Sequence, residues 1–79
     1  MLETMIMVNC LNDACKNIMR HANEFDGFES AFMVDKRHSS IDANLVINIG
    51  AESRDQVMEV KDRILNMDGV SSIKYWITE

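Results

Sequence analysis

A chain of 79 residues is long enough for one domain, and its 47% hydrophobic and 27% charged residues are typical of a folded globular protein. The formal net charge of -5 argues against a nucleic-acid-binding protein, because neutralisation of phosphates by lysine and arginine dominates the affinity of such proteins. The apolar N-terminus is too short for a membrane span and lacks the basic residues of a signal peptide, so we expect a single cytoplasmic domain over residues 1–79, with no membrane and no nucleic-acid partner.

The start of the chain predicts a strand followed by a helix. Thr4–Cys10 alternates as a strand does, with Ile6 and Val8 on the face expected to be buried. Asn12 or Asp13 is predicted to cap the helix, because either side chain can accept hydrogen bonds from the free N–H groups of its first turn. An apolar stripe at helical spacing then predicts the face that packs on the sheet: Cys15, Ile18, Met19, Ala22 and Phe25.

Two strands joined by a turn are predicted after Asp26-Gly27, where the helix is expected to end. Phe28–Lys36 alternates, and we assign Ala31 and Met33 to the sheet face away from the helices. The turn is assigned to Lys36–Ser40 and the next strand to Ser40–Gly50. Every second residue of this strand is apolar and is expected to face the core: Ile41, Ala43, Leu45, Ile47 and Ile49.

A second helix and a last strand complete the pattern. Ser53 and Gln56 form a capping box at the helix start, and Gly69 is expected to end the helix. Its apolar stripe comprises Val57, Val60, Ile64 and Met67. The last strand starts at Val70 and places Trp76 opposite the core. This order of elements predicts a ferredoxin-like α+β sandwich, in which a four-stranded antiparallel sheet carries both helices on one face and the first and third strands are central.

The sheet face away from the helices is the surface where we expect a ligand or partner. A tryptophan and several methionines are predicted there, and these residue types are enriched in the cores of protein interfaces. RNA-recognition domains share this topology but use aromatic residues on the two central strands, where this chain has Met7 and Asn48. The predicted surface comprises Trp76, Met33, Val46, Asn48 and Met7.

Cys10 and Cys15 lie where the first strand passes into the first helix. We expect two reduced cysteines that behave as small buried apolar residues, because free cysteine is among the most buried residue types. The alternative is a soft-metal site, in which two thiolates converge near a helix start. Their spacing has four intervening residues, whereas metal carriers of this fold have two.

The sequence does not predict an enzyme or a cofactor. His21 and His38 are the only histidines, and neither has a nucleophile and an orienting acid at a recognisable spacing. Glycine-rich phosphate loops and zinc-ligand spacings are also missing from the sequence.

Three resemblances to known families add to this pattern. The order of elements, the size and the ending Ile64-Leu65-Asn66-Met67-Asp68-Gly69-Val70 resemble small ACT-like regulatory domains. The resemblance implies binding of an amino acid or another small effector, usually between two copies of the domain. The glycine-containing turn of ACT-like domains after the first strand is replaced here by Asn9–Asp13.

Two further stretches resemble other families. Leu45–Glu79 is similar in pattern to the cytoplasmic chaperone of periplasmic nitrate reductase, which binds the signal peptide of its enzyme. Asn12–Ala43 resembles the first half of the phosphocarrier protein HPr, with Ala22-Asn23-Glu24-Phe25 and Ile41-Asp42-Ala43 carrying the likeness. The active histidine of HPr is absent, so this resemblance implies no phosphotransfer.

The sequence therefore favours a non-catalytic regulatory module that binds a small molecule and acts as a homodimer. One alternative is a chaperone or adaptor that captures an extended peptide at the free edge of Phe28–Lys36. The others are an HPr-like protein without phosphotransfer activity and a soft-metal carrier that uses Cys10 and Cys15.

Overall fold

The computed structural model describes residues 1–38 and 40–78, so Ser39 of the predicted turn and Glu79 of the chaperone-like stretch lie outside the described residues. Its elements are β1 (Leu2–Cys10), α1 (Asn12–His21), the 3-10 turn η1 (Ala22–Glu24), β2 (Phe28–Met33), the 3-10 turn η2 (Lys36–His38), β3 (Leu45–Ala51), α2 (Arg54–Leu65) and β4 (Val70–Thr78).

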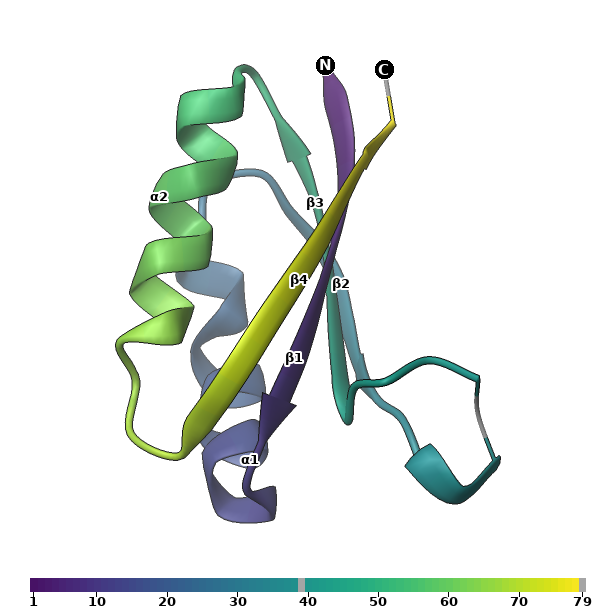
Figure 1. Cartoon of the computed structure of the whole chain (residues 1–79). Coiled ribbons are helices and arrows are strands. Elements are labelled where there is room, and N and C mark those ends of the chain that lie inside the picture. The colour runs from purple at the N-terminus through teal and green to yellow at the C-terminus, as the bar shows by residue number, and fades with distance from the viewer. Residues whose placement is uncertain (39, 79) are drawn as a thin grey trace.

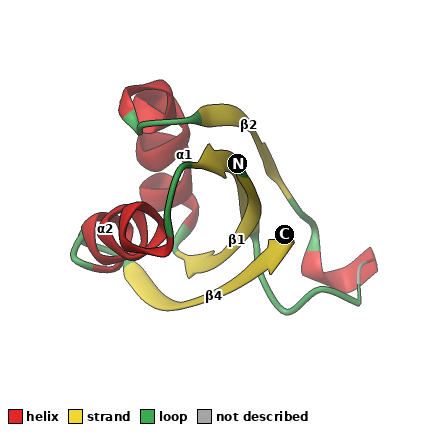
Figure 2. Ribbon diagram, turned by 90° about the horizontal axis from the view of Figure 1, so that it is seen from above, coloured by secondary structure: helices red, strands yellow, loops and turns green. Residues whose placement is uncertain are grey.

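The strands form one antiparallel sheet in the order β2-β3-β1-β4. Both helices lie on one side of this sheet, and the connection between β2 and β3 projects on the other side (Figures 1 and 2). The predicted ferredoxin-like α+β sandwich is thereby confirmed, including the central position of the first and third strands. Among the described residues, no helix is both long and apolar enough to cross a membrane.

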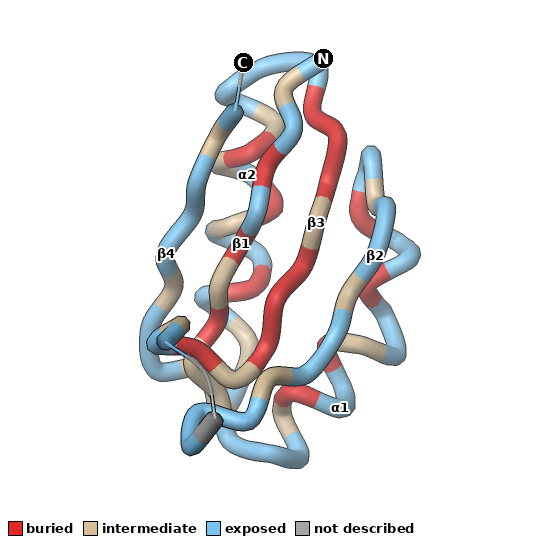
Figure 3. The backbone as a smooth tube through the Cα atoms, turned by 90° about the vertical axis from the view of Figure 1, so that its right-hand side faces the viewer, coloured by how far each residue is buried: buried red, intermediate tan, exposed pale blue. Residues whose placement is uncertain are grey.

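The core lies between the sheet and the helices. Of the residues in β3, six are buried and one is partly buried, because this central strand has a neighbour on each side and helices over one face (Figure 3). The predicted helix stripes and strand faces supply the rest of the core. The side chains that are at most 3% exposed include Ile6, Val8, Ile18, Phe25, Leu45, Ile47, Ile49, Val57, Val60 and Ile64.

The first helix starts one residue earlier than predicted. Asn12 is already helical, and the capping position is taken by Leu11, which offers no side-chain hydrogen bond. The backbone N–H of Leu11 instead donates to the carbonyl of Gly69 at 2.9 Å, which ties the β1–α1 junction to the start of β4. The predicted cap at Asn12 or Asp13 is therefore wrong, because a contact distant in sequence anchors this helix end.

The capping box of the second helix is confirmed. Ser53 Oγ accepts a hydrogen bond from the Gln56 N–H at 3.3 Å, and Gln56 Oε1 accepts one from the Glu52 N–H at 2.9 Å. Gln56 Nε2 also donates to the Asp26 carbonyl at 3.1 Å. These bonds connect the start of α2 to the loop that precedes β2.

Replacing the capping hydroxyl should measurably destabilise the protein. We expect Ser53→Ala to lower the free energy of unfolding by roughly 0.5–2 kcal/mol, because one N–H of the first helical turn loses its acceptor. Urea denaturation measured by circular dichroism checks this value. Ser53→Asp keeps an acceptor at the cap and should retain most of the stability, so equal losses in the two variants would contradict the capping role.

A β-bulge in β2 reverses the predicted facing of most of this strand. The register shifts between Phe28, which pairs with Ile49, and Ser30, which pairs with Asn48. Phe28 packs on the core, but after the shift Ala31 lies on the core side and Phe32 on the open side. The assignment of Ala31 and Met33 to the open side is therefore wrong, because one extra residue inverts the alternation.

The strands around the β2–β3 connection are shorter than predicted. β2 ends at Met33, and β3 begins at Leu45 instead of Ser40. Asn44 explains the late start of β3: its Oδ1 accepts from the Cys10 N–H at 2.8 Å, and its Nδ2 donates to the Cys10 carbonyl. The Asn44 side chain thus bonds the end of β1 as a strand backbone would, and the chain before it follows another path.

Candidate functional site

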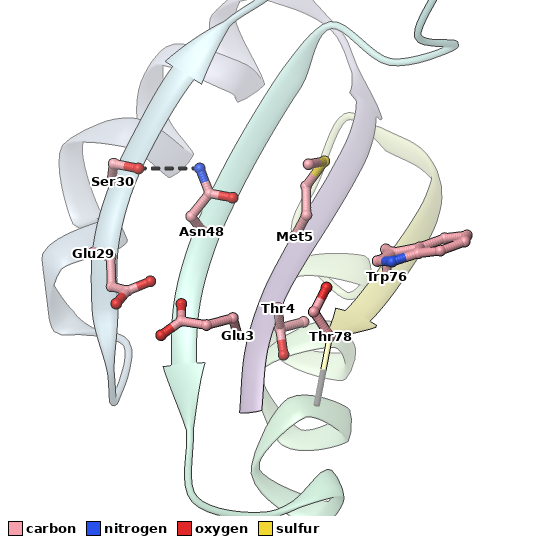
Figure 4. A pocket seen from close by; sticks show the side chains of 8 residues that line it. All are labelled: Glu3, Thr4, Met5, Glu29, Ser30, Asn48, Trp76 and Thr78. Carbon is pink, nitrogen blue, oxygen red and sulfur yellow. Dashed lines mark hydrogen bonds between the residues drawn. The ribbon is translucent and has the colours of Figure 1, made fainter. Parts of the chain in front are cut away.

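The side of the sheet away from α1 and α2, which we call the open face, presents side chains from all four strands. Cross-strand pairing sets Met5 between Asn48 and Trp76, and Met7 between Val46 and Lys74. β2 adds two residues after the bulge, Ser30 beside Asn48 and Phe32 beside Val46. The Asn48 Nδ2 donates to Ser30 Oγ at 3.1 Å, which joins the two polar members of this row (Figure 4).

Three large apolar side chains of the open face remain in contact with water. Trp76 is 67% exposed, Phe32 46% and Met5 37%. Val46, which pairs with Phe32 on one side and Met7 on the other, is fully buried. A tryptophan with two thirds of its surface exposed is unusual for a folded domain, and exposed apolar side chains of this size are typical of interaction sites.

The structure brings together four of the five residues predicted for this surface. Trp76, Val46, Asn48 and Met7 lie on the open face, whereas the bulge moves Met33 to the other side, where it pairs with Leu45. Phe32 takes its place on the open face. The alternation of residue types did not reveal this exchange, because Phe28–Met33 can also be read as a regular strand without the extra residue.

A hollow of about 350 Å³ opens at one end of this face, between two carboxylates and the tryptophan (Figure 4). Gly50 pairs with Glu3 beside this hollow, and a side chain at Gly50 would overlap Met1 Sδ and approach Glu29 Oε2. A hydrogen bond with Glu3 raises the pKa of Glu29, and desolvation and the negative charge of Glu3 raise it further. The lining residues are Glu3, Thr4, Met5, Glu29, Ser30, Asn48, Trp76 and Thr78.

A second hollow, of about 380 Å³, lies at the opposite end of β1 beside the β1–α1 junction. Asn9 Nδ2 donates to the Asp42 carbonyl at 2.9 Å and to Ser72 Oγ at 3.2 Å, but its Oδ1 is buried and has no hydrogen-bond partner in the described part of the chain. Lys36 lines the same hollow, and its Nζ lies 3.8 Å from Asp42 Oδ1. The hollow is thus lined by a residue whose side-chain acceptor has no partner among the described residues and by a lysine that is paired with Asp42.

The two cysteines form a disulfide, which corrects the expectation of two reduced thiols. Cys10 ends β1 and Cys15 lies in α1, with their Cα atoms 5.7 Å apart. Cys15 is fully buried in the core, as predicted. Disulfide-bonded sulfurs are not thiolates, so in this state the pair cannot bind a soft metal.

The described residues contain no cluster of metal-ligating side chains. No three histidine, cysteine, aspartate or glutamate side chains in residues 1–38 and 40–78 are placed to hold a metal ion. His21 is exposed on the last turn of α1, and its Nδ1 lies 3.6 Å from Glu24 Oε1. This pair lies apart from the residues that line both hollows.

Comparison with known proteins finds likeness in structure but not in sequence. The sequence matches no family model, and it matches no curated protein. A protein from Thermus thermophilus superposes with a TM-score of 0.83 at 12% identity, over 100% of this chain and 94% of the other. That neighbour has the same size and the same fold, which supports the architecture described above.

Larger proteins contain the same fold as one part. A Neisseria meningitidis transcriptional regulator, solved in complex with L-Met, superposes with a TM-score of 0.76 at 15% identity. E. coli AsnC superposes with a TM-score of 0.73 at 14% identity. The alignments cover 99% and 98% of this chain but only 49% and 50% of those proteins, so the chain spans about half their length. At these identities the likeness shows a shared fold.

Proposed function

We propose that this protein is a non-catalytic regulatory module of ACT-like type, which binds a small effector and acts as a homodimer in the cytoplasm. The observation that carries the proposal is the hollow beside the β1–α1 junction, where the buried Asn9 Oδ1 has no partner in the described part of the chain. A buried acceptor without a donor is costly, and a ligand N–H would remove that cost.

The chemistry of this hollow favours an effector with an amino group and a carboxylate. Asn9 and Lys36 both line the hollow: the Asn9 Oδ1 would accept from an ammonium that reaches it, and Lys36 Nζ, which now lies 3.8 Å from Asp42 Oδ1, would pair with the carboxylate of the effector. The Neisseria meningitidis regulator with the same fold was solved with L-Met, an effector that has both groups. We therefore propose amino acids as the effector class.

A panel of amino acids, including L-Met, tests this function by thermal unfolding. A true effector at about 100 times its Kd adds roughly 2.7 kcal/mol to stability, which raises the Tm of a domain this small by roughly 10–20 °C. Lys36→Met should reduce this shift, whereas Lys16→Met, the same change on the exposed side of α1, should not. If no amino acid changes the Tm, or if the two variants respond equally, the proposal is wrong.

A second candidate function is capture of an extended peptide at the outer edge of β2. Within the described part of the chain this strand lies at the edge of the sheet and pairs with β3, and Phe32 and Met33, on its two sides, are 46% and 41% exposed. Chemical-shift changes confined to residues 28–33 during titration with an apolar peptide would favour it. No observation favours the HPr-like alternative, and the disulfide counts against the metal carrier.

A further inference from the structure

The disulfide between Cys10 and Cys15 has one partly exposed end and one buried end. Cys10 is the last residue of β1, is partly exposed and lines the hollow of about 380 Å³ beside the β1–α1 junction. Cys15 lies in α1 and is fully buried in the core. A thiolate that cleaves a disulfide must reach one of its two sulfurs. Access from solvent to this bond is therefore greater on the Cys10 side.

Hydrogen bonds hold the β1–α1 junction independently of the disulfide. The Cys10 N–H donates to Asn44 Oδ1 at 2.8 Å, and the Cys10 carbonyl accepts from Asn44 Nδ2. The Leu11 N–H donates to the Gly69 carbonyl at 2.9 Å, so the junction lies against the loop that leads into β4 (Figure 1). The two cysteines are only 5 positions apart, and a disulfide that closes a short loop contributes less to stability than one that closes a long loop. We expect the native fold to survive cleavage of this disulfide.

The position of Cys15 suits a sulfur that leaves and later returns. Cys15 is in the first turns of α1, and the side chain of a helical residue leans toward the helix N-terminus, where free N–H groups stabilise a departing thiolate. Leu11 at the capping position offers these N–H groups no side-chain acceptor, and Asp13, the acidic residue of this turn, is exposed. A neutral thiol is favoured over a thiolate in the apolar core, so the released Cys15 takes up a proton and remains buried close to Cys10.

We propose that Cys10 is a thiol-exchange site for low-molecular-weight thiols, which the hollow beside it can admit. A small thiolate attacks Cys10 Sγ and forms a mixed disulfide, while the Cys10–Cys15 bond breaks and Cys15 leaves as a thiolate that takes up a proton. A second small thiolate attacks the small-molecule sulfur of the mixed disulfide and releases Cys10. The protein then has two thiols, and the two small thiols have been oxidised to their own disulfide.

The reverse reaction, with a small disulfide as the oxidant, restores the bridge. In this direction Cys10 attacks the small disulfide, and Cys15 then attacks Cys10 Sγ and releases the small thiol. Disulfides of cytoplasmic proteins are usually transient and catalytic or redox-sensing. The inference shares only this location with the proposed function and does not depend on effector binding.

Reduction of the native protein by dithiothreitol tests the inference, with iodoacetamide to trap free thiols and mass spectrometry to count them. We expect reduction at urea concentrations well below the unfolding transition, at a rate that does not change with urea, and the reduced protein should keep the circular dichroism spectrum of the folded state. A rate that rises with urea in proportion to the unfolded fraction would overturn the inference, because the disulfide would then react only after unfolding. Loss of the folded spectrum on reduction would also overturn it, because the bridge would then be structural.

Single-cysteine variants identify the sulfur that exchanges. Cystine should modify the Cys15→Ala protein, which keeps Cys10, more than about tenfold faster than the Cys10→Ala protein, which keeps the buried Cys15. Circular dichroism shows whether both variants are folded. Peptide mapping of the wild-type protein during reaction with L-cysteine gives the same assignment without a substitution, and the mixed disulfide should be found at Cys10. Equal rates in the two variants, or a mixed disulfide mainly at Cys15, would overturn the assignment.

The effector site is tested separately from the exchange site. Changes in Tm caused by amino acids without a thiol, measured on the oxidised protein, report on effector binding alone. Either proposal can therefore fail while the other stands.

Discussion

Ile47→Ala should unfold a large fraction of the protein. Ile47 is fully buried at the centre of β3, pairs with Ile6 and Ala31, and belongs to the cluster between the sheet and the helices. Removing three carbon atoms there loses transfer free energy and leaves a cavity, at a cost of roughly 2–5 kcal/mol. Domains of this size have a total stability close to about 5 kcal/mol, so the loss is comparable to the whole. Urea denaturation gives the value.

The neighbouring residue is the matched control for this prediction. Asn48 points to the open face and donates one hydrogen bond to Ser30, so Asn48→Ala should cost at most about 1 kcal/mol. The two substitutions lie at adjacent positions of β3, whose side chains point to opposite faces of the sheet. Their relative cost therefore shows which face of β3 lies against the core. If Asn48→Ala were the more damaging change, β3 would face the opposite way.

The elements that were predicted correctly are those set by residues close together in the sequence. Alternation in β1 and β3 and the helix stripes identified the buried core, because burial repeats along each of these elements; in β4 it identified Ile73 and Ile77, which pack against the core, but not Tyr75, which is 40% exposed. The capping box at Ser53 was also predictable, since its donor and acceptor are three residues apart. The order of the elements then left one common topology, which the structure has.

The failures all involve contacts between residues far apart in the sequence. The start of α1 is held by Gly69, and the late start of β3 depends on the hydrogen bonds between Asn44 and Cys10. The bulge after Phe28 exchanges Met33 for Phe32 on the open face. None of these contacts leaves a periodic signal, so the position of the candidate surface was predictable but its full composition was not.

The disulfide between Cys10 and Cys15 was also not predictable from the sequence. Five positions separate them, and the spacing alone does not decide between two buried thiols, a metal pair and a disulfide. The decision depends on how β1 turns into α1, which brings the two Cα atoms to 5.7 Å, within the range that a disulfide needs. That approach is a property of the tertiary structure.

Gly27→Ala should be the second strongly destabilising change. Gly27 has a φ of +78°, which L-residues with a side chain rarely adopt, and its carbonyl accepts from the Gly50 N–H at 2.8 Å. A Cβ there would lie 2.1 Å from the Gly50 carbonyl oxygen, so the backbone itself must move. Backbone strain and overpacking each cost about 1–3 kcal/mol, and we expect roughly 2–6 kcal/mol in total.

Asp26→Ala is the control for this change, because Asp26 is exposed and its backbone carbonyl can still accept from Gln56 Nε2. It should alter the free energy of unfolding by about 0.5 kcal/mol or less. A comparable effect of the two variants would show that the chain can move away from Gly50 at little cost. A large difference would show that this approach fixes the start of β2, and with it the bulge that places Glu29 above Gly50 on the open face.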